Sequence, residues 1–98
     1  MTSQSNVLSD PRPRDVADYG FARVRDIAFD AVQTLWHRRR QEGMQQANIA
    51  TAIGRDRAWV SRNLRAPGNW TLRTIGELVE ALGGELEIVV HAKEDLPE

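Results

Sequence analysis

The chain has 98 residues, which is enough for one domain, and it contains no cysteine. Disulfides and cysteine-rich zinc sites are therefore excluded, and its two histidines, His37 and His91, stand too far apart in the sequence for a metal site. No apolar run of about 18 residues occurs, and the first residues are polar, unlike those of a signal peptide. We therefore expect a cytoplasmic protein with no membrane segment, no metal and no cofactor.

The formal net charge of −1 conceals a segregation of charge along the chain. Residues 37–73 hold eight arginines against two acidic residues, whereas residues 74–98 hold one lysine against seven acidic residues. The planar guanidinium of arginine suits bidentate contacts with phosphate and guanine. The central block is therefore a candidate for nucleic-acid binding, although charge alone fits a solvated helix face equally well. The run 37–40 in particular fits either a solvated helix end or a phosphate contact.

Residues 1–13 are polar and include two prolines, which indicates a mobile N-terminal tail. From about residue 15 to residue 40, apolar residues recur at spacings of three and four, the period of a helix with one apolar stripe facing a core. Gly20 leaves open a later start for this helix, and Gly43 is placed to end it. The stripe consists of Val16, Ala17, Phe21, Val24, Ile27, Ala28, Ala31, Val32, Leu35 and Trp36.

Three shorter helices are predicted after the first, each bounded by recognisable start and stop signals. Asp56 and Thr71 are placed to cap the second and third of them at their N-termini. Gly54 suits the tight turn between the first two, because a residue without Cβ adopts positive φ at little cost. The predicted bounds are 45–53, 57–64 and 72–82, and the inward face of the last helix consists of Leu72, Ile75, Leu78, Val79 and Leu82.

Residues 85–91 change to a period of two, with Leu86, Ile88 and Val90 alternating against mostly polar neighbours. This pattern is typical of a half-buried strand, and it is the only strand predicted in the chain. A lone strand leaves backbone groups unpaired, and the same strand of a second copy would satisfy them about a two-fold axis. We therefore predict a homodimer with these three residues at its interface. An extended tail packed on the helices, or pairing with the N-terminal tail, are the alternatives.

Five residues of the central block occur at a characteristic spacing. They are Gln46, Ala50, Gly54, Val60 and Ser61. A small residue is needed where two helices cross, and a glycine is needed in the turn between them. With this spacing the chain resembles the lambda-repressor-like (Cro/repressor, xenobiotic-response-element type) helix-turn-helix family.

The resemblance implies a mainly α fold, a lambda-repressor-like bundle of about four helices with a long N-terminal helix. The resemblance covers about residues 24–83, and together with the composition of the tail and the period of the strand it divides the chain into a mobile tail at 1–13, a helix-turn-helix DNA-binding domain at 14–83, and a C-terminal strand with an acidic tail at 84–98. The strand pairs across the predicted dimer. We expect the acidic residues of the last quarter on the face opposite the DNA-binding helix.

The resemblance also implies which residues meet double-stranded DNA. The second helix of the motif lies in the major groove, with its outward side chains at base edges. Trp59 either packs on the core or faces the groove as a wedge. The implied base-reading residues are Arg57, Ala58, Ser61 and Arg62, and the implied contacts to the DNA backbone are Gln46, Arg55, Arg65, Asn69 and Thr71.

The function expected from these features is a sequence-specific transcriptional regulator, a dimeric repressor of its own promoter that reads a palindromic operator. The alternative is an antitoxin, which neutralises a toxin protein by direct binding and autoregulates its operon. A helix-turn-helix used only for protein contacts fits the arginines of the second helix less well. We expect no enzymatic activity, because the sequence offers no cysteine nucleophile and no glycine-rich phosphate loop, and no partner residues near either histidine.

Overall fold

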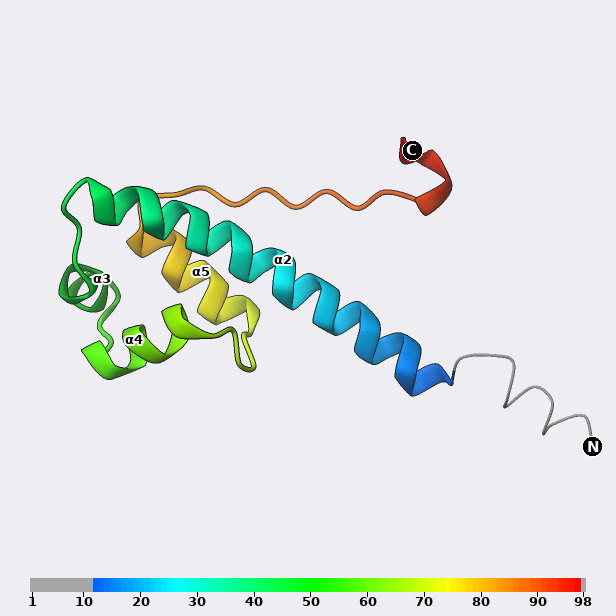
Figure 1. The fold of residues 1–98 in the computed structure, drawn as a ribbon, viewed down its shortest axis with the longest axis horizontal. Coiled ribbons are helices and arrows are strands. Elements are labelled where there is room, and N and C mark those ends of the chain that lie inside the picture. The colour runs from blue at the N-terminus through cyan, green and yellow to red at the C-terminus, as the bar shows by residue number, and fades with distance from the viewer. Residues whose placement is uncertain (1–11, 98) are drawn as a thin grey trace, which may run out of the picture.

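The computed structural model describes residues 12–97, which form a helical bundle with no β-strand among them. Its elements are α2 (Pro13–Gln41), α3 (Gln46–Ile53), α4 (Arg57–Arg65), α5 (Leu72–Ala81) and the 3-10 turn η1 (Lys93–Asp95). Helices α3, α4 and α5 gather beside the C-terminal half of α2, while its N-terminal half projects beyond them (Figure 1). The predicted mainly helical class is confirmed, and each short helix begins and ends within one residue of its predicted bounds.

The hydrophobic core lies where the C-terminal half of α2 meets the three short helices. Ile49, Val60 and Leu78, one from each short helix, are fully buried, and Trp36 is the large residue that α2 adds to them. Each fully buried aliphatic side chain contributes about 1.5–3 kcal/mol relative to its exposed state. The buried cluster comprises Val32, Trp36, Ile49, Ala50, Val60, Leu64, Trp70, Leu78 and Leu82.

The helix ends carry the local signals that the sequence predicts. The Asp56 carboxylate accepts a hydrogen bond from the backbone N–H of Trp59 at 2.7 Å. The Thr71 hydroxyl accepts one from the N–H of Thr74 at 3.2 Å. Gly54 ends α3 with a φ of 69°, in the left-handed region that favours glycine. These contacts fix where α4 and α5 begin, because each satisfies a backbone donor that the helix itself cannot pair.

Helix α2 is continuous from Pro13, so a later start after Gly20 is wrong. Proline suits the first position of a helix, where its missing N–H would have no partner and its fixed φ is already helical. The predicted mobile tail reaches residue 13, and residues 1–11 of it lie outside the described part of the chain.

The basic run at the end of α2 is engaged within the protein. The Nε of Arg39 donates to the Leu82 carbonyl at the end of α5 at 2.8 Å, and its Nη1 pairs with Glu42 at 3.0 Å. Arg38 also pairs with Glu42, at 3.2 Å. Both arginines lower the pKa of the Glu42 carboxyl by hydrogen bonding to it. Two of the three arginines in the run therefore stabilise helix ends in this bundle.

Two predicted core faces are only partly covered. Leu72, expected on the inward face of α5, is 79% exposed because it lies in the first turn, at the edge of the bundle. The stripe of α2 is buried only in its C-terminal half, since α3, α4 and α5 do not reach the other half (Figure 1). Its large exposed members, called the uncovered stripe below, are Val16, Phe21, Val24 and Ile27.

Residues 84–92, the C-terminal segment, start beside the C-terminal half of α2 and run in extended form toward the side of the molecule on which α2 begins, diverging from the helix as they go (Figure 1). The segment starts in close contact with the helix, because a Cβ on Gly84 would lie 2.6 Å from Cδ2 of Leu35. It pairs with no other strand within residues 12–97, so the predicted strand is an unpaired extended chain here. The exposed fraction rises along it, from 48% at Leu86 to 71% at Ile88 and 90% at Val90.

Candidate nucleic-acid interface

Helix α4 has two chemically different faces. Its inward face buries Val60 and Leu64 in the core, and the Asn63 amide donates to the carbonyl of Trp59 at 2.9 Å. At 100° per residue, Ala58, Arg62 and Arg65 point away from these two residues and Ser61 points to the side, whereas Arg57 points within about 20° of Leu64 and is exposed because it lies in the first turn. The outward face, as the term is used below, comprises Arg57, Ala58, Ser61, Arg62 and Arg65.

The four predicted base-reading residues spread over about 140° of the surface of α4, from Arg57 to Arg62. Arg57, Ala58 and Arg62 are exposed. Ser61 is half-buried, and its hydroxyl accepts a hydrogen bond from Nη2 of Arg65 at 3.3 Å. Ser61 is thus the least accessible of the four, and the three others present two guanidinium groups on either side of a small apolar side chain.

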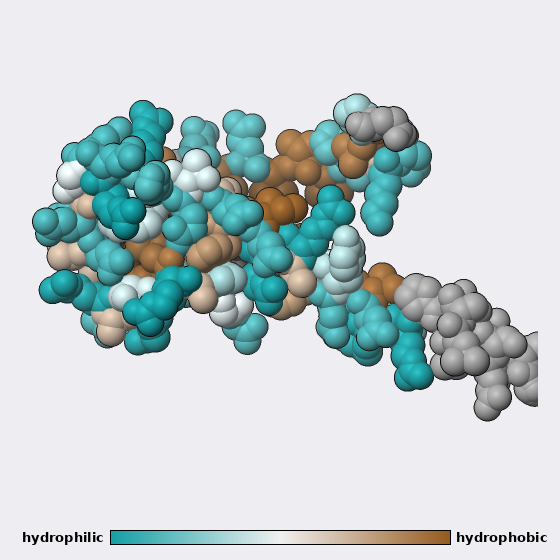
Figure 2. All heavy atoms as spheres, viewed as in Figure 1, coloured by the Kyte–Doolittle hydropathy of each residue, from teal (hydrophilic) through white to brown (hydrophobic). Residues whose placement is uncertain are grey.

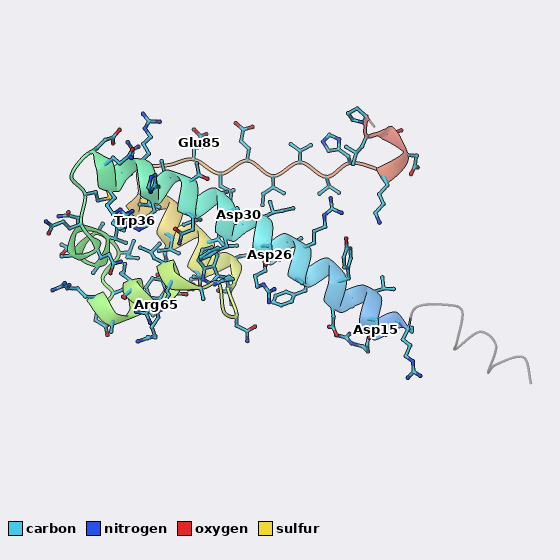
Figure 3. All side chains as sticks on the ribbon, in the orientation of Figure 1. Asp15, Asp26, Asp30, Trp36, Arg65 and Glu85 are labelled. Carbon is cyan, nitrogen blue, oxygen red and sulfur yellow. The ribbon has the colours of Figure 1, made fainter. Side chains whose placement is uncertain are left out.

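The outward face of α4 is positively charged. Within residues 12–97, Arg57, Arg62 and Arg65 form no ion pair, and α4 itself contains no acidic residue. Arg65 on α4 and Glu85 in the C-terminal segment lie on opposite sides of the molecule (Figure 3). Two acidic residues of 12–97 nevertheless lie close to this face, namely Asp56 at the N-cap of α4 and Glu77 on α5.

Glu77 on α5 lies beside the turn between α3 and α4. It accepts hydrogen bonds from Nε and Nη2 of Arg55 at 2.8 and 3.1 Å, and Arg73 approaches it at 3.9 Å. Bonding to Arg55 lowers the pKa of the Glu77 carboxyl and raises the pKa of the guanidinium. The expectation that the acidic residues all face away from the DNA-binding helix is wrong for Glu77.

The guanidinium of Arg55 is also held from a second side. Its Cζ lies 4.5 Å from the centroid of the half-buried Trp59 ring, within the range of a cation–π contact. Trp59 packs against the core, which agrees with the first of its two interpretations and leaves no free wedge for a groove. Arg55, predicted to contact the DNA backbone, thus ties the α3–α4 turn to α5. No periodicity links Arg55 with Glu77, so the sequence offered no signal for their pairing.

The remaining predicted backbone contacts lie at helix starts. Gln46 opens α3 and is half-buried, while Asn69 and Thr71 are exposed before α5. The Asn48 side chain accepts a hydrogen bond from the N–H of Gln45 at 2.7 Å, a cap that the sequence analysis missed. The signal available for this cap was a polar side chain, Asn48, three residues after the N-cap position Gln45.

Other kinds of site find little support in the described residues. No group of three or more potential metal ligands occurs within residues 12–97. None of the helices in that range is long and apolar enough to cross a membrane.

A scan against protein-family models and searches of curated proteins and of solved structures found no match to this chain. The resemblance to lambda-repressor-like proteins therefore rests on the spacing of its own residues. It stays a prediction.

Proposed function

We propose that α3 and α4 form a helix-turn-helix unit and that the chain is a sequence-specific DNA-binding regulator acting as a homodimer. The observation that carries this proposal is the outward face of α4. It combines three arginines that have no ion-pair partner within residues 12–97 with a helix held firmly from behind by Val60 and Leu64. Arginine is the residue that most often reads guanine in the major groove.

In this proposal α4 enters the major groove. Arg57 and Arg62 donate in bidentate fashion to O6 and N7 of guanine, and Ala58 contacts a thymine methyl group. Arg65, Asn69 and Thr71 contact phosphates and fix the register, while Gln46 does so from the start of α3. Arg55 acts on the geometry instead, since its bonds to Glu77 hold the turn in place.

Dimerisation completes the proposed mechanism. Two α4 helices about 34 Å apart would read successive major grooves on one face of a palindromic operator. A dimer bound there would block transcription from an overlapping promoter, and the promoter of its own gene is the first candidate.

Fluorescence anisotropy tests the proposal. The full chain is titrated onto DNA from upstream of its own gene and onto a scrambled duplex of equal length, across a series of salt concentrations. We expect tighter binding to the upstream DNA at every concentration. Equal binding to both duplexes with a steep salt dependence would mean phosphate attraction alone and would contradict the proposal.

The second candidate function is that of an antitoxin, and one observation favours it. The uncovered stripe of α2 leaves Phe21 48% and Val24 64% exposed, an apolar surface that another protein could cover. Co-purification with the product of an adjacent gene would support this function. The observation loses its force if a second copy of the chain covers the stripe.

A further inference from the structure

Two apolar surfaces of this molecule are left exposed by the other residues of 12–97. One is the uncovered stripe of α2, and the other is the C-terminal segment, which starts beside Leu35 of that helix and then diverges from its N-terminal half (Figure 1). Brown, apolar residues accompany the segment, whereas the surface over α3 and α4 is mostly teal (Figure 2). A monomer rarely leaves large apolar surfaces open.

Both surfaces start from one anchor, the contact between Leu35 and Gly84. Val24 lies about three helical turns from Leu35, or about 16 Å, and at 100° per residue it points within about 20° of the same direction. Ile88 lies about 13 Å beyond Gly84 along an extended chain. Val24 and Ile88 are therefore at comparable distances from the anchor, one along α2 and the other along the C-terminal segment.

The C-terminal segment is self-complementary in one antiparallel register. With Ile88 opposite Ile88 of the second copy, Leu86 lies opposite Val90, and Glu85 lies opposite His91, whose imidazole can donate to a carboxylate. Opposite residues share a face, so all the apolar pairs fall on one side of the ribbon. A ribbon centred one residue earlier would instead place two glutamates directly opposite each other.

Helix α2 is self-complementary about Val24. An antiparallel crossing centred there places Gly20 opposite Ala28 and Phe21 opposite Ile27 of the second copy. Gly20 has no heavy atom within 4 Å of a Cβ built on it, so the helix surface is open at that point. Small residues on either side of the crossing let the two helices approach closely, with the larger side chains filling the adjoining space.

We propose that a second copy of this chain covers both surfaces at once. In the resulting dimer the two α2 helices cross at Val24, beneath a two-stranded antiparallel ribbon centred on Ile88. A single two-fold axis serves both contacts. The interface supplies the homodimer that the proposed function uses, and it fixes how far apart the two α4 helices lie, but it does not itself require DNA.

Cysteine cross-linking tests this arrangement directly, because the natural chain contains no cysteine. A residue on the two-fold axis meets its own copy, so Val24→Cys and Ile88→Cys should each form a covalent dimer under mild oxidation. A disulfide needs Cα atoms about 4.4–6.8 Å apart. Tyr19→Cys and Val89→Cys are matched controls, since both are well exposed on the same elements but point away from the axis. We expect most of the chain cross-linked in the first pair and little in the controls.

Sedimentation equilibrium of the unmodified chain and of Ile88→Asp completes the test. We expect a dimer for the first and a folded monomer, with unchanged helical circular dichroism, for the second. A monomeric unmodified chain would overturn the proposal and leave the stripe to a different protein. Cross-linking at Ile88 without cross-linking at Val24 would also overturn it, since the strands alone would then hold the dimer. Anisotropy on upstream DNA is scored separately, so failure of the dimer and failure of DNA binding remain distinguishable.

Discussion

The two halves of this molecule use the same sequence pattern with opposite results. Around α3, α4 and α5, apolar residues at spacings of three and four are buried, with Leu78 and Leu82 fully so. In the N-terminal half of α2 the same spacing leaves Val16 55% and Ile27 59% exposed. Periodicity thus identifies which face of a helix is apolar, but it does not identify what covers that face. We infer that the part formed by α3, α4 and α5 presents the DNA-reading surface and that the N-terminal half of α2 joins two copies.

The largest expected effect is on the free energy of unfolding, and it separates buried from exposed apolar residues. Leu78→Ala removes a fully buried side chain from α5 and should destabilise the protein by about 2–5 kcal/mol, because the lost burial is followed by a cavity. Leu72→Ala on the same helix is the matched control, since Leu72 is 79% exposed. Urea denaturation of both variants measures the difference. Equal losses would mean that the core does not lie where the packing places it.

If α4 reads DNA and the N-terminal half of α2 joins two copies, substitutions on α4 should affect DNA binding and leave the dimer intact. Arg62→Ala, and likewise Arg57→Ala, should weaken binding to the upstream DNA by about 1–3 kcal/mol while changing binding to scrambled DNA little. The sedimentation mass should stay that of the unmodified chain. Arg14→Ala is the matched control, because it removes one positive charge from an exposed ion pair with Asp18 at the far end of α2. Similar losses on both duplexes would make the arginine a phosphate contact rather than a base reader.

Removing the N-terminal cap of α4 should have a smaller effect on the stability of the protein. Asp56→Ala removes the side chain that accepts from the N–H of Trp59, which should destabilise the chain by about 1 kcal/mol. Asp56→Asn keeps a capping oxygen and should restore most of the loss. Thermal unfolding followed by circular dichroism measures both variants. An Asn variant as unstable as the Ala variant would show that the carboxylate acts by charge rather than as a cap.

The local part of the fold could be predicted because its determinants are local. Asp56, Thr71 and Gly54 act within one turn of themselves, and the predicted bounds of the short helices were accordingly correct to within one residue. The exposure of Leu72 could not be predicted, since it depends on how far neighbouring helices reach.

The candidate site follows the same rule. The exposure of Ala58 and Arg62 follows from the period of α4 and could be predicted, whereas that of Arg57 follows from its place in the first turn. The use of Arg55 within the protein could not, because its partner lies 22 positions away on another helix. An arginine beside a proposed recognition helix is a reasonable candidate for a phosphate contact until its nearest carboxylate is known.

The smallest expected effect tests that same ion pair through pH. Because the Arg55 guanidinium lowers the pKa of Glu77 below its ordinary value of 4.5, folding favours the ionised carboxylate. The pair therefore stabilises the protein above that value, and the contribution is lost as pH falls through the lowered pKa of the folded state. Glu77→Gln should lower the melting temperature near pH 7, and this loss should shrink as the pH falls below 4.5. Glu80→Gln, one turn along α5 and without an ion pair within residues 12–97, should leave the melting temperature almost unchanged over the same pH range. A Glu77→Gln effect that persists in acid would mean that the carboxylate stabilises the turn by packing or neutral hydrogen bonds, and Arg55 would then be free to contact DNA.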